Sequence, residues 1–74
     1  MNLLDGVIGK TYQVIKLKTE DKNIFLARGI LPNTIIMIKY KNKSNHIIII
    51  ETDDITLAMR KNLASLIEVK ICSY

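Results

Sequence analysis

The chain has 74 residues, of which 49% are hydrophobic and 24% charged, and its net charge at pH 7 is +4. A chain of this length buries only about 60% of the surface that its unfolded form exposes, so residues 1–74 are expected to form one small domain. Its single cysteine, Cys72, excludes a disulfide within the chain and is typical of a reducing compartment. No apolar run approaches the roughly 20 residues that span a bilayer, and residues 1–10 do not resemble a signal peptide. We therefore expect a cytoplasmic protein with no membrane-inserted segment.

The first predicted strand covers residues 10–18, and its apolar residues alternate imperfectly. Tyr12 and Val14 suit one face of a strand, whereas Ile15 and Leu17 suit the other. A β-bulge within the strand, or burial of both faces, would explain this pattern.

Residues 19–28 predict a short helix. Thr19 suits the N-cap position, and Arg28 suits the last turn, where a cation interacts favourably with the helix dipole. Gly29 then suits the left-handed position that ends a helix, because a Cβ is penalised there. Pro32 prevents the helix from resuming and begins a turn.

The rest of the chain predicts four more strands and one helical turn. The predicted strands are 34–41, 46–53, 55–60 and 67–71; the polar loop 42–45 joins the first two as a hairpin, and the helical turn lies within 61–66. In the last strand Ile67, Val69 and Ile71 share one face. Five short strands, with one short helix after the first and a single helical turn before the last, suit a small SH3-like barrel, whose closure removes exposed sheet edges.

Two separated motifs resemble those of the FeoA family. FLARGILPNT at residues 25–34 resembles the family pattern L-L-x-x-G-L/I-x-P-G-T, and ITLAMRKNLASLIEV at residues 55–69 resembles x-I/L-A-L/I-R-x-x-x-A-x-x-I-x-V. At the N-terminus Leu3 and Gly9 match the leucine and glycine of a third family segment. Two departures stand out: Asn33 replaces a glycine but tolerates a left-handed backbone, and Gly6 replaces an apolar residue.

The resemblance implies an SH3-like domain that acts as a non-enzymatic accessory protein of bacterial ferrous-iron uptake. It also implies a partner, FeoB, which is a membrane transporter with a cytosolic GTPase domain. The same fold occurs as the C-terminal domain of metal-responsive repressors. This chain has no DNA-binding helical segment, so we do not expect a repressor.

The residues themselves predict neither catalysis nor a bound metal or cofactor. His46 stands alone in a hairpin region, without a cysteine, serine or second histidine to form a catalytic or metal-binding set. Glu51, Asp53 and Asp54 lie close together in the sequence, but no second carboxylate cluster or EF-hand-like loop accompanies them. The glycines do not form a phosphate-binding G-x-x-x-x-G-K-S/T loop.

The alternative hypothesis is a basic barrel that binds RNA or DNA through the hairpin 34–53. Lys39, Lys41 and Lys43 alternate along it and suit phosphate contacts. Proteins that bind single strands use aromatic stacking platforms, however, and the three tyrosines are dispersed. Tyr40 also shares the inward parity of its strand. We therefore expect these lysines mainly to keep the strand tip soluble.

The same hairpin carries the candidate partner-binding residues. The resemblance to the FeoA family implies a register in which one set points inward, namely Ile36, Ile38, Ile48 and Ile50. Alternation then directs a second apolar set outward, namely Ile35, Met37, Ile47 and Ile49.

Four adjacent outward residues would form a patch of roughly 300–400 Å², near the limit for an isolated monomer. Covering it would contribute about 7–10 kcal/mol at about 25 cal/mol/Å², against an association cost of about 4–15 kcal/mol. The patch alone therefore predicts weak or transient partner binding, or weak self-association. The alternative is that the helix or the N-terminal segment covers this face within the chain.

Overall fold

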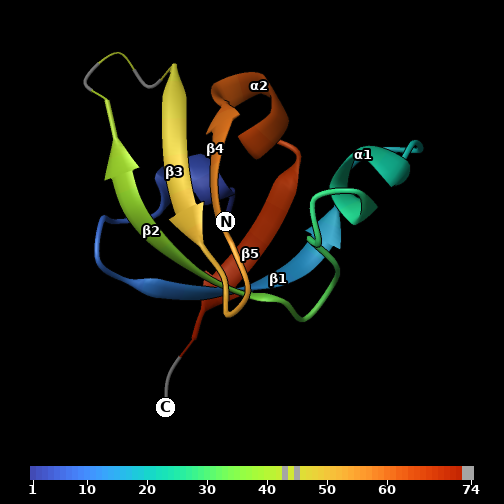
Figure 1. Cartoon of the computed structure of the whole chain (residues 1–74), viewed down its shortest axis with the longest axis horizontal. Coiled ribbons are helices and arrows are strands. Elements are labelled where there is room, and N and C mark those ends of the chain that lie inside the picture. Colours follow the sequence, from blue (N-terminus) through green and yellow to red (C-terminus); the bar gives the residue numbers. More distant parts are fainter. Residues whose placement is uncertain (43, 45, 73–74) are drawn as a thin grey trace.

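One antiparallel sheet of five strands organises the chain (Figure 1). The computed structural model describes residues 1–42, 44 and 46–72. In chain order the elements are the 3-10 helix η1 (Leu3–Asp5), β1 (Thr11–Leu17), α1 (Asn23–Leu26), β2 (Ile35–Lys41), β3 (Ile47–Glu51), β4 (Thr56–Arg60), α2 (Lys61–Ala64) and β5 (Ile67–Ile71). The predicted mainly-β fold, with a short helix after the first strand and one helical turn before the last, is confirmed.

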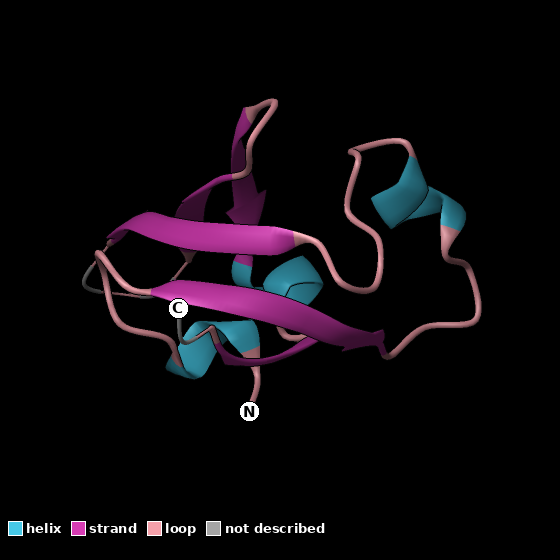
Figure 2. Ribbon diagram, turned by 90° about the horizontal axis from the view of Figure 1, so that it is seen from below, coloured by secondary structure: helices cyan, strands magenta, loops and turns pink. Residues whose placement is uncertain are grey.

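The sheet curls around its core but keeps two edges, as Figure 2 shows from below. Its strand order is β4-β3-β2-β1-β5, and within the described residues no ladder joins β4 to β5. The expectation that closure removes the sheet edges is therefore corrected. The physical reason is local: the chain enters α2 directly after β4 and then returns on the far side of β1.

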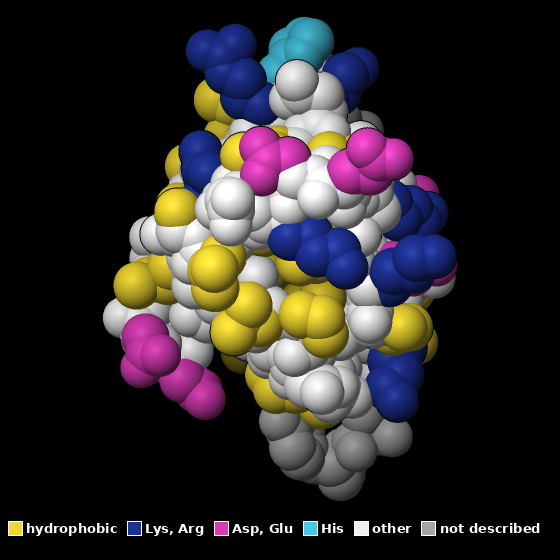
Figure 3. All heavy atoms as spheres, turned by 90° about the vertical axis from the view of Figure 1, so that its right-hand side faces the viewer, with side chains coloured by type: hydrophobic (Ala, Val, Ile, Leu, Met, Phe, Trp, Pro, Cys, Tyr) yellow, Lys and Arg dark blue, Asp and Glu magenta, His cyan; other side chains and the backbone are white. Residues whose placement is uncertain are grey.

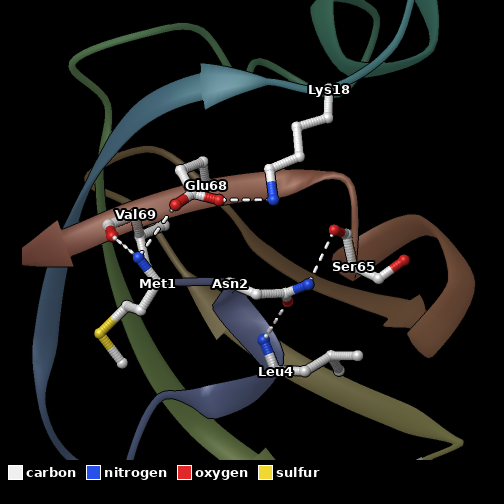
Figure 4. Close-up of polar contacts among 7 residues, drawn as sticks. All are labelled: Met1, Asn2, Leu4, Lys18, Ser65, Glu68 and Val69. Atoms are coloured by element: carbon white, nitrogen blue, oxygen red, sulfur yellow. Dashed lines mark hydrogen bonds and ion pairs between the residues drawn. The ribbon is translucent and has the colours of Figure 1, made fainter.

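The N-terminal residues cover the free edge of β5 (Figure 4). The N–H of Val69 donates to the carbonyl oxygen of Met1 at 2.7 Å, and Asn2 forms a β-bridge with Glu68. The Asn2 side chain also donates to the carbonyl oxygen of Ser65 at 2.8 Å. The first residues of the chain are thus attached to the last strand.

Glu68 joins this edge to β1. Its carboxylate lies 2.7 Å from the ammonium of Lys18 and 3.0 Å from the α-amino group of Met1 (Figure 4). Hydrogen bonds from Lys18 and then from the N-terminus stabilise the ionised form and hold the pKa of Glu68 below its ordinary value of 4.5.

The core is apolar, and every strand contributes to it. The predicted inward set is confirmed, because Ile36, Ile38, Ile48 and Ile50 are all buried. Phe25 of α1 and Leu3 of η1 are also fully buried and close the ends of the core. No side chain of the described residues buries an unpaired nitrogen or oxygen.

A β-bulge interrupts β1, as the imperfect alternation predicted. The register with β5 shifts between Val14 and Lys16. As a result Leu17 returns to the buried face of Tyr12 and Val14, while Ile15 is 49% exposed. The bulge rather than burial of both faces therefore explains the sequence pattern.

The first helix is shorter than predicted and begins at Asn23 rather than after Thr19. The hydroxyl of Thr19 accepts from the N–H of Asp21 at 3.3 Å, and the carboxylate of Asp21 accepts from the N–H of Asn23 at 3.2 Å. These local side-chain contacts satisfy the backbone as turns, which compete with helix formation.

The end of this helix follows the sequence prediction. Gly29 has φ of +75°. The N–H groups of Gly29 and Ile30 donate to the carbonyls of Leu26 and Phe25, which is the pattern of a Schellman motif. The guanidinium of Arg28 donates to the carbonyl oxygen of Ile24 at 2.6 Å and satisfies another terminal acceptor. Asn33 also adopts a left-handed conformation, with φ of +77°.

A second bulge, which the sequence did not predict, lies in β2. The register with β3 shifts between Ile38 and Tyr40, so Tyr40 faces Ile49 and Lys41 faces Ile48. The inward parity assigned to Tyr40 is therefore wrong: the extra residue, Lys39, turns the Tyr40 side chain to the outer face, where it is 49% exposed. Residues 43 and 45 of the predicted hairpin loop lie outside the described residues.

Candidate partner-binding surface

The four residues predicted to point outward differ in their cross-strand partners. On β2, Ile35 pairs with Gln13 of β1 and Met37 pairs with Thr11 of β1. Ile47 and Ile49 lie on β3 toward β4. Cross-strand neighbours on one face interact directly, so these two pairs have different surroundings.

The larger group gathers around Ile49, which faces Tyr40 of β2 on one side and Ala58 of β4 on the other. Ile47 lies two residues away on the same face and is 43% exposed. We call Tyr40, Ile47, Ile49 and Ala58 the Ile49 cluster. Tyr40 and Ala58 were not among the predicted site residues. Only knowledge of the β2 bulge and of the β3–β4 register would have identified them.

The smaller group is the Met37 pair, Ile35 and Met37, and both of its side chains are half-buried. The strand partner of Met37 on β3 is Glu51, whose carboxylate lies 3.9 Å from the ammonium of Lys39. Lys39 lies between Met37 and the next outward residue of β2. This ion pair therefore borders the Met37 pair.

Neither element proposed to cover this face does so. The N-terminal segment lies against β5 and α2, as its hydrogen bonds show (Figure 4). The helix α1 lies beyond the end of β1, on the side opposite the tip of the β2–β3 hairpin (Figure 1). Within the described residues, the outer face of the Ile49 cluster is thus left to solvent.

One of the three lysines considered for phosphate binding points away from solvent. The ammonium of Lys41 donates to the carbonyl oxygens of Leu4 and Gly6, at 2.9 and 2.7 Å. The same bulge that turns Tyr40 outward turns Lys41 toward the N-terminal segment. Lys39 is engaged with Glu51, and residue 43 lies outside the described residues. The alternating row of lysines predicted for this hairpin is therefore not present as such.

The border of the Ile49 cluster is basic. A surface hollow of about 410 Å³ beside it is lined by His46, Ile47, Arg60, Lys61 and Asn62. In this part of the chain neither Arg60 nor Lys61 forms an ion pair with any residue that the structure describes. His46 is exposed and bonds through its main chain, since its N–H donates to the Asn42 side chain at 2.9 Å.

The acidic residues do not form a metal site within residues 1–42, 44 and 46–72. No group of three or more histidine, cysteine, aspartate or glutamate side chains lies close enough there to hold an ion. Among the helices of the same residues, none has the length and apolar character required to cross a bilayer.

Comparison with known proteins identifies the family. The family model for the FeoA domain matches residues 1–71. The chain is similar to the solution structure of iron(II) transport protein A from Clostridium thermocellum, with a TM-score of 0.87 and 25% identity, covering 96% of this chain and 45% of that one. It is also similar to a FeoA-like protein from Clostridium acetobutylicum, with a TM-score of 0.87 and 25% identity, covering 100% of this chain and 88% of that one.

The fold also occurs in a manganese-dependent transcriptional repressor, with a TM-score of 0.85 and 18% identity. The match covers 96% of this chain and 40% of the repressor, so the chain spans less than half the length of that protein and of the Clostridium thermocellum protein. No curated protein matches this chain in sequence.

Proposed function

The chain belongs to the FeoA family, and on this premise we propose that it is a non-enzymatic accessory protein of ferrous-iron transport. Support for the transport role comes from the 25% identity to an iron(II) transport protein A over almost the whole chain. The site of action is the cytoplasm, where the chain binds the cytosolic GTPase region of a FeoB-type membrane transporter.

The uncovered Ile49 cluster is the observation that supports binding. It combines half-exposed aliphatic and aromatic side chains, Ile47 and Tyr40, with a border that carries Arg60 and Lys61. Interfaces commonly place an apolar centre inside a polar rim, and charged rims select and orient partners. The complementary surface is therefore apolar at its centre and acidic at its border.

The mechanism is equilibrium binding. A small domain that docks on one conformation of a larger protein shifts the population toward that conformation in proportion to its differential affinity. An apolar patch of four side chains supports weak or transient association, which suits a modulator that binds reversibly.

The test is a binding titration with the purified cytosolic GTPase domain of the FeoB-type transporter from the same organism. Ile47→Lys places a charge in the Ile49 cluster and is expected to weaken binding at least tenfold, whereas Met37→Lys leaves it within about twofold. Ile15→Lys is the matched control, because Ile15 is also a strand isoleucine of similar exposure but lies on β1. Equal affinities for correctly folded Ile47→Lys and Ile15→Lys variants would remove the Ile49 cluster from the proposal.

A further inference from the structure

The two edges of the sheet differ in whether another segment of the chain pairs with them. The N-terminal residues pair with the edge of β5, and the N–H of Val69 is bonded to Met1. The other edge, on β4, has no such strand beside it among the described residues. Exposed edges are sites at which another extended chain can add, and proteins usually block them.

The alternation of hydrogen-bonded pairs along the β3–β4 ladder shows which main-chain groups of β4 do not bond to β3. The register is one-to-one from the Ile47–Arg60 pair to the Glu51–Thr56 pair. Beyond its two ends, Lys61 N–H donates to the His46 carbonyl at 3.0 Å, and Thr52 N–H donates to the Ile55 carbonyl at 2.8 Å.

Hydrogen-bonded and non-hydrogen-bonded pairs alternate in an antiparallel ladder. Leu57 and Met59 therefore turn their N–H and C=O groups toward β3. Thr56 and Ala58 turn theirs toward the free edge, as does the N–H of Arg60. Apart from the ladder itself, no main-chain acceptor engages the N–H groups of these three within the described residues.

The free edge opens into a groove with a second wall. One hollow of about 370 Å³ is lined by Arg28 together with Ala58–Arg60, Asn62 and Leu63. A neighbouring hollow of about 430 Å³ is lined by Ala27, Arg28 and Gly29 on one side and by residues of the β3–β4 turn and β4 on the other. Arg28 lines both, so the end of α1 stands along the open side of β4.

This face also carries exposed apolar side chains. Figure 3 shows hydrophobic groups in the middle of the face that bears α1, with charged groups around them. Ile55, which lines the second hollow, is among the exposed hydrophobic residues. The groove therefore offers both main-chain partners and apolar contacts to a bound strand.

The charges of the groove differ between its two ends. Arg60 lies at the end toward α2, Arg28 lines both hollows, and neither forms an ion pair within the described residues. Asp54 lies at the other end, in the turn before β4. An added strand that carries a carboxylate near Arg60 is attracted, and one that carries it near Asp54 is repelled.

From these observations we propose that the edge of β4 binds an extended peptide segment of a partner protein, antiparallel to β4, with an acidic residue at its N-terminal end. Main-chain hydrogen bonds to Thr56, Ala58 and Arg60 supply affinity, as in β-strand addition generally. This proposal concerns the main-chain edge of β4, which adjoins the Ile49 cluster and shares Ala58 with it, and it does not depend on iron transport.

The test uses a capped synthetic peptide, acetyl-Glu-Thr-Val-Thr-Val-Thr-amide, added to the ¹⁵N-labelled chain. Saturable shifts are expected for the amide signals of Thr56, Ala58, Arg60 and Gly29. The same peptide with lysine in place of glutamate binds about two- to fivefold more weakly, in line with an exposed charge pair. A peptide with N-methylated valines cannot donate its ladder hydrogen bonds and gives no saturable shift.

Variants of the chain provide a second readout. Ala58→Pro removes an N–H that β3 does not use, and proline is tolerated on sheet edges, so it is expected to fold and to lose peptide binding. Arg60→Gln weakens binding about two- to fivefold, whereas Lys70→Gln on β5 leaves it unchanged.

Three results overturn the proposal. The first is the absence of shifts at millimolar peptide, and the second is equal binding of the N-methylated peptide. The third is concentration-dependent dimerisation that Ala58→Pro abolishes, which would assign this edge to a second copy of the chain.

Discussion

The ammonium of Lys41 lies 2.7 Å from the carbonyl oxygen of Gly6, and this contact joins β2 to the N-terminal segment, which is distant in the sequence. The contact exists because the bulge at Lys39 reverses the orientation of the residues that follow it in β2. A lysine that strand parity assigns to solvent thus fixes the segment between η1 and β1.

Replacing Lys41 by methionine is expected to destabilise the fold by about 1–3 kcal/mol, because two charge-assisted hydrogen bonds to carbonyl groups are lost. Lys39→Met is the matched control on the same strand, and loss of its exposed ion pair with Glu51 costs about 0–1 kcal/mol. Urea denaturation of the two variants measures the difference. Equal losses of stability would show that the Lys41 contacts contribute nothing specific.

Gly6 is required for space rather than for backbone freedom. A Cβ at this position would overlap the Cδ1 atom of Ile38 and would lie 3.0 Å from Cε2 of Tyr12. Gly6→Ala is therefore expected to cost about 1–3 kcal/mol in thermal or urea unfolding.

The double variant Gly6→Ala/Ile38→Val tests this cause, since valine lacks the obstructing methyl group. It should lose less stability than the sum of the two single variants, with a coupling of about 0.5 kcal/mol or more. Strict additivity would contradict the steric explanation.

Gly29 is required for its backbone conformation, because a Cβ there would meet no atom within 4 Å but φ is +75°. Gly29→Ala is expected to cost about 1–2 kcal/mol, which is the penalty of a left-handed residue. Gly29→Asn should cost less, as asparagine does at position 33. Differential scanning calorimetry of the two variants compares them, and a larger loss for asparagine would argue against this account.

The pKa of Glu68 is lowered by its hydrogen bonds from Lys18 and the N-terminus, and this gives the fold an acid-sensitive component. The contribution of Glu68 to stability is fully present above its ordinary pKa of 4.5 and is lost as pH falls through the lower folded-state pKa. Glu68→Gln should therefore flatten the acid side of the stability–pH profile. Glu20→Gln, an exposed control, should leave the slope unchanged.

Residue patterns predicted most of the fold because they record local chemistry. The β1 bulge was visible because Ile15 and Leu17 break the alternation set by Tyr12 and Val14. The sequence pattern of β2 does not indicate its bulge. Apolar residues occupy both faces before the bulge, and lysines flank Tyr40 on both sides, so no break in the alternation marks the extra residue. Register is set by pairing between strands, which alternation within one strand does not report.

The candidate site was predicted in part for the same reason. The inward and outward isoleucines of the hairpin were assigned correctly, but their grouping depends on which cross-strand partner each one meets. Ile49 meets Tyr40 and Ala58, whereas Met37 meets Glu51. The short helix was overextended because the turn-forming contacts of Thr19 and Asp21 compete with the helical pattern over the same residues.

The placement of β1 between β2 and β5 has a consequence for synthesis. A nascent chain that has left the ribosome only as far as α2 contains four strands but cannot yet pair the second side of β1. Until the final strand emerges, a row of main-chain groups on β1 stays open to mispairing, and such distant pairing also slows folding. Emergence of β5 is thus the step that lets β1 complete its pairing on both sides.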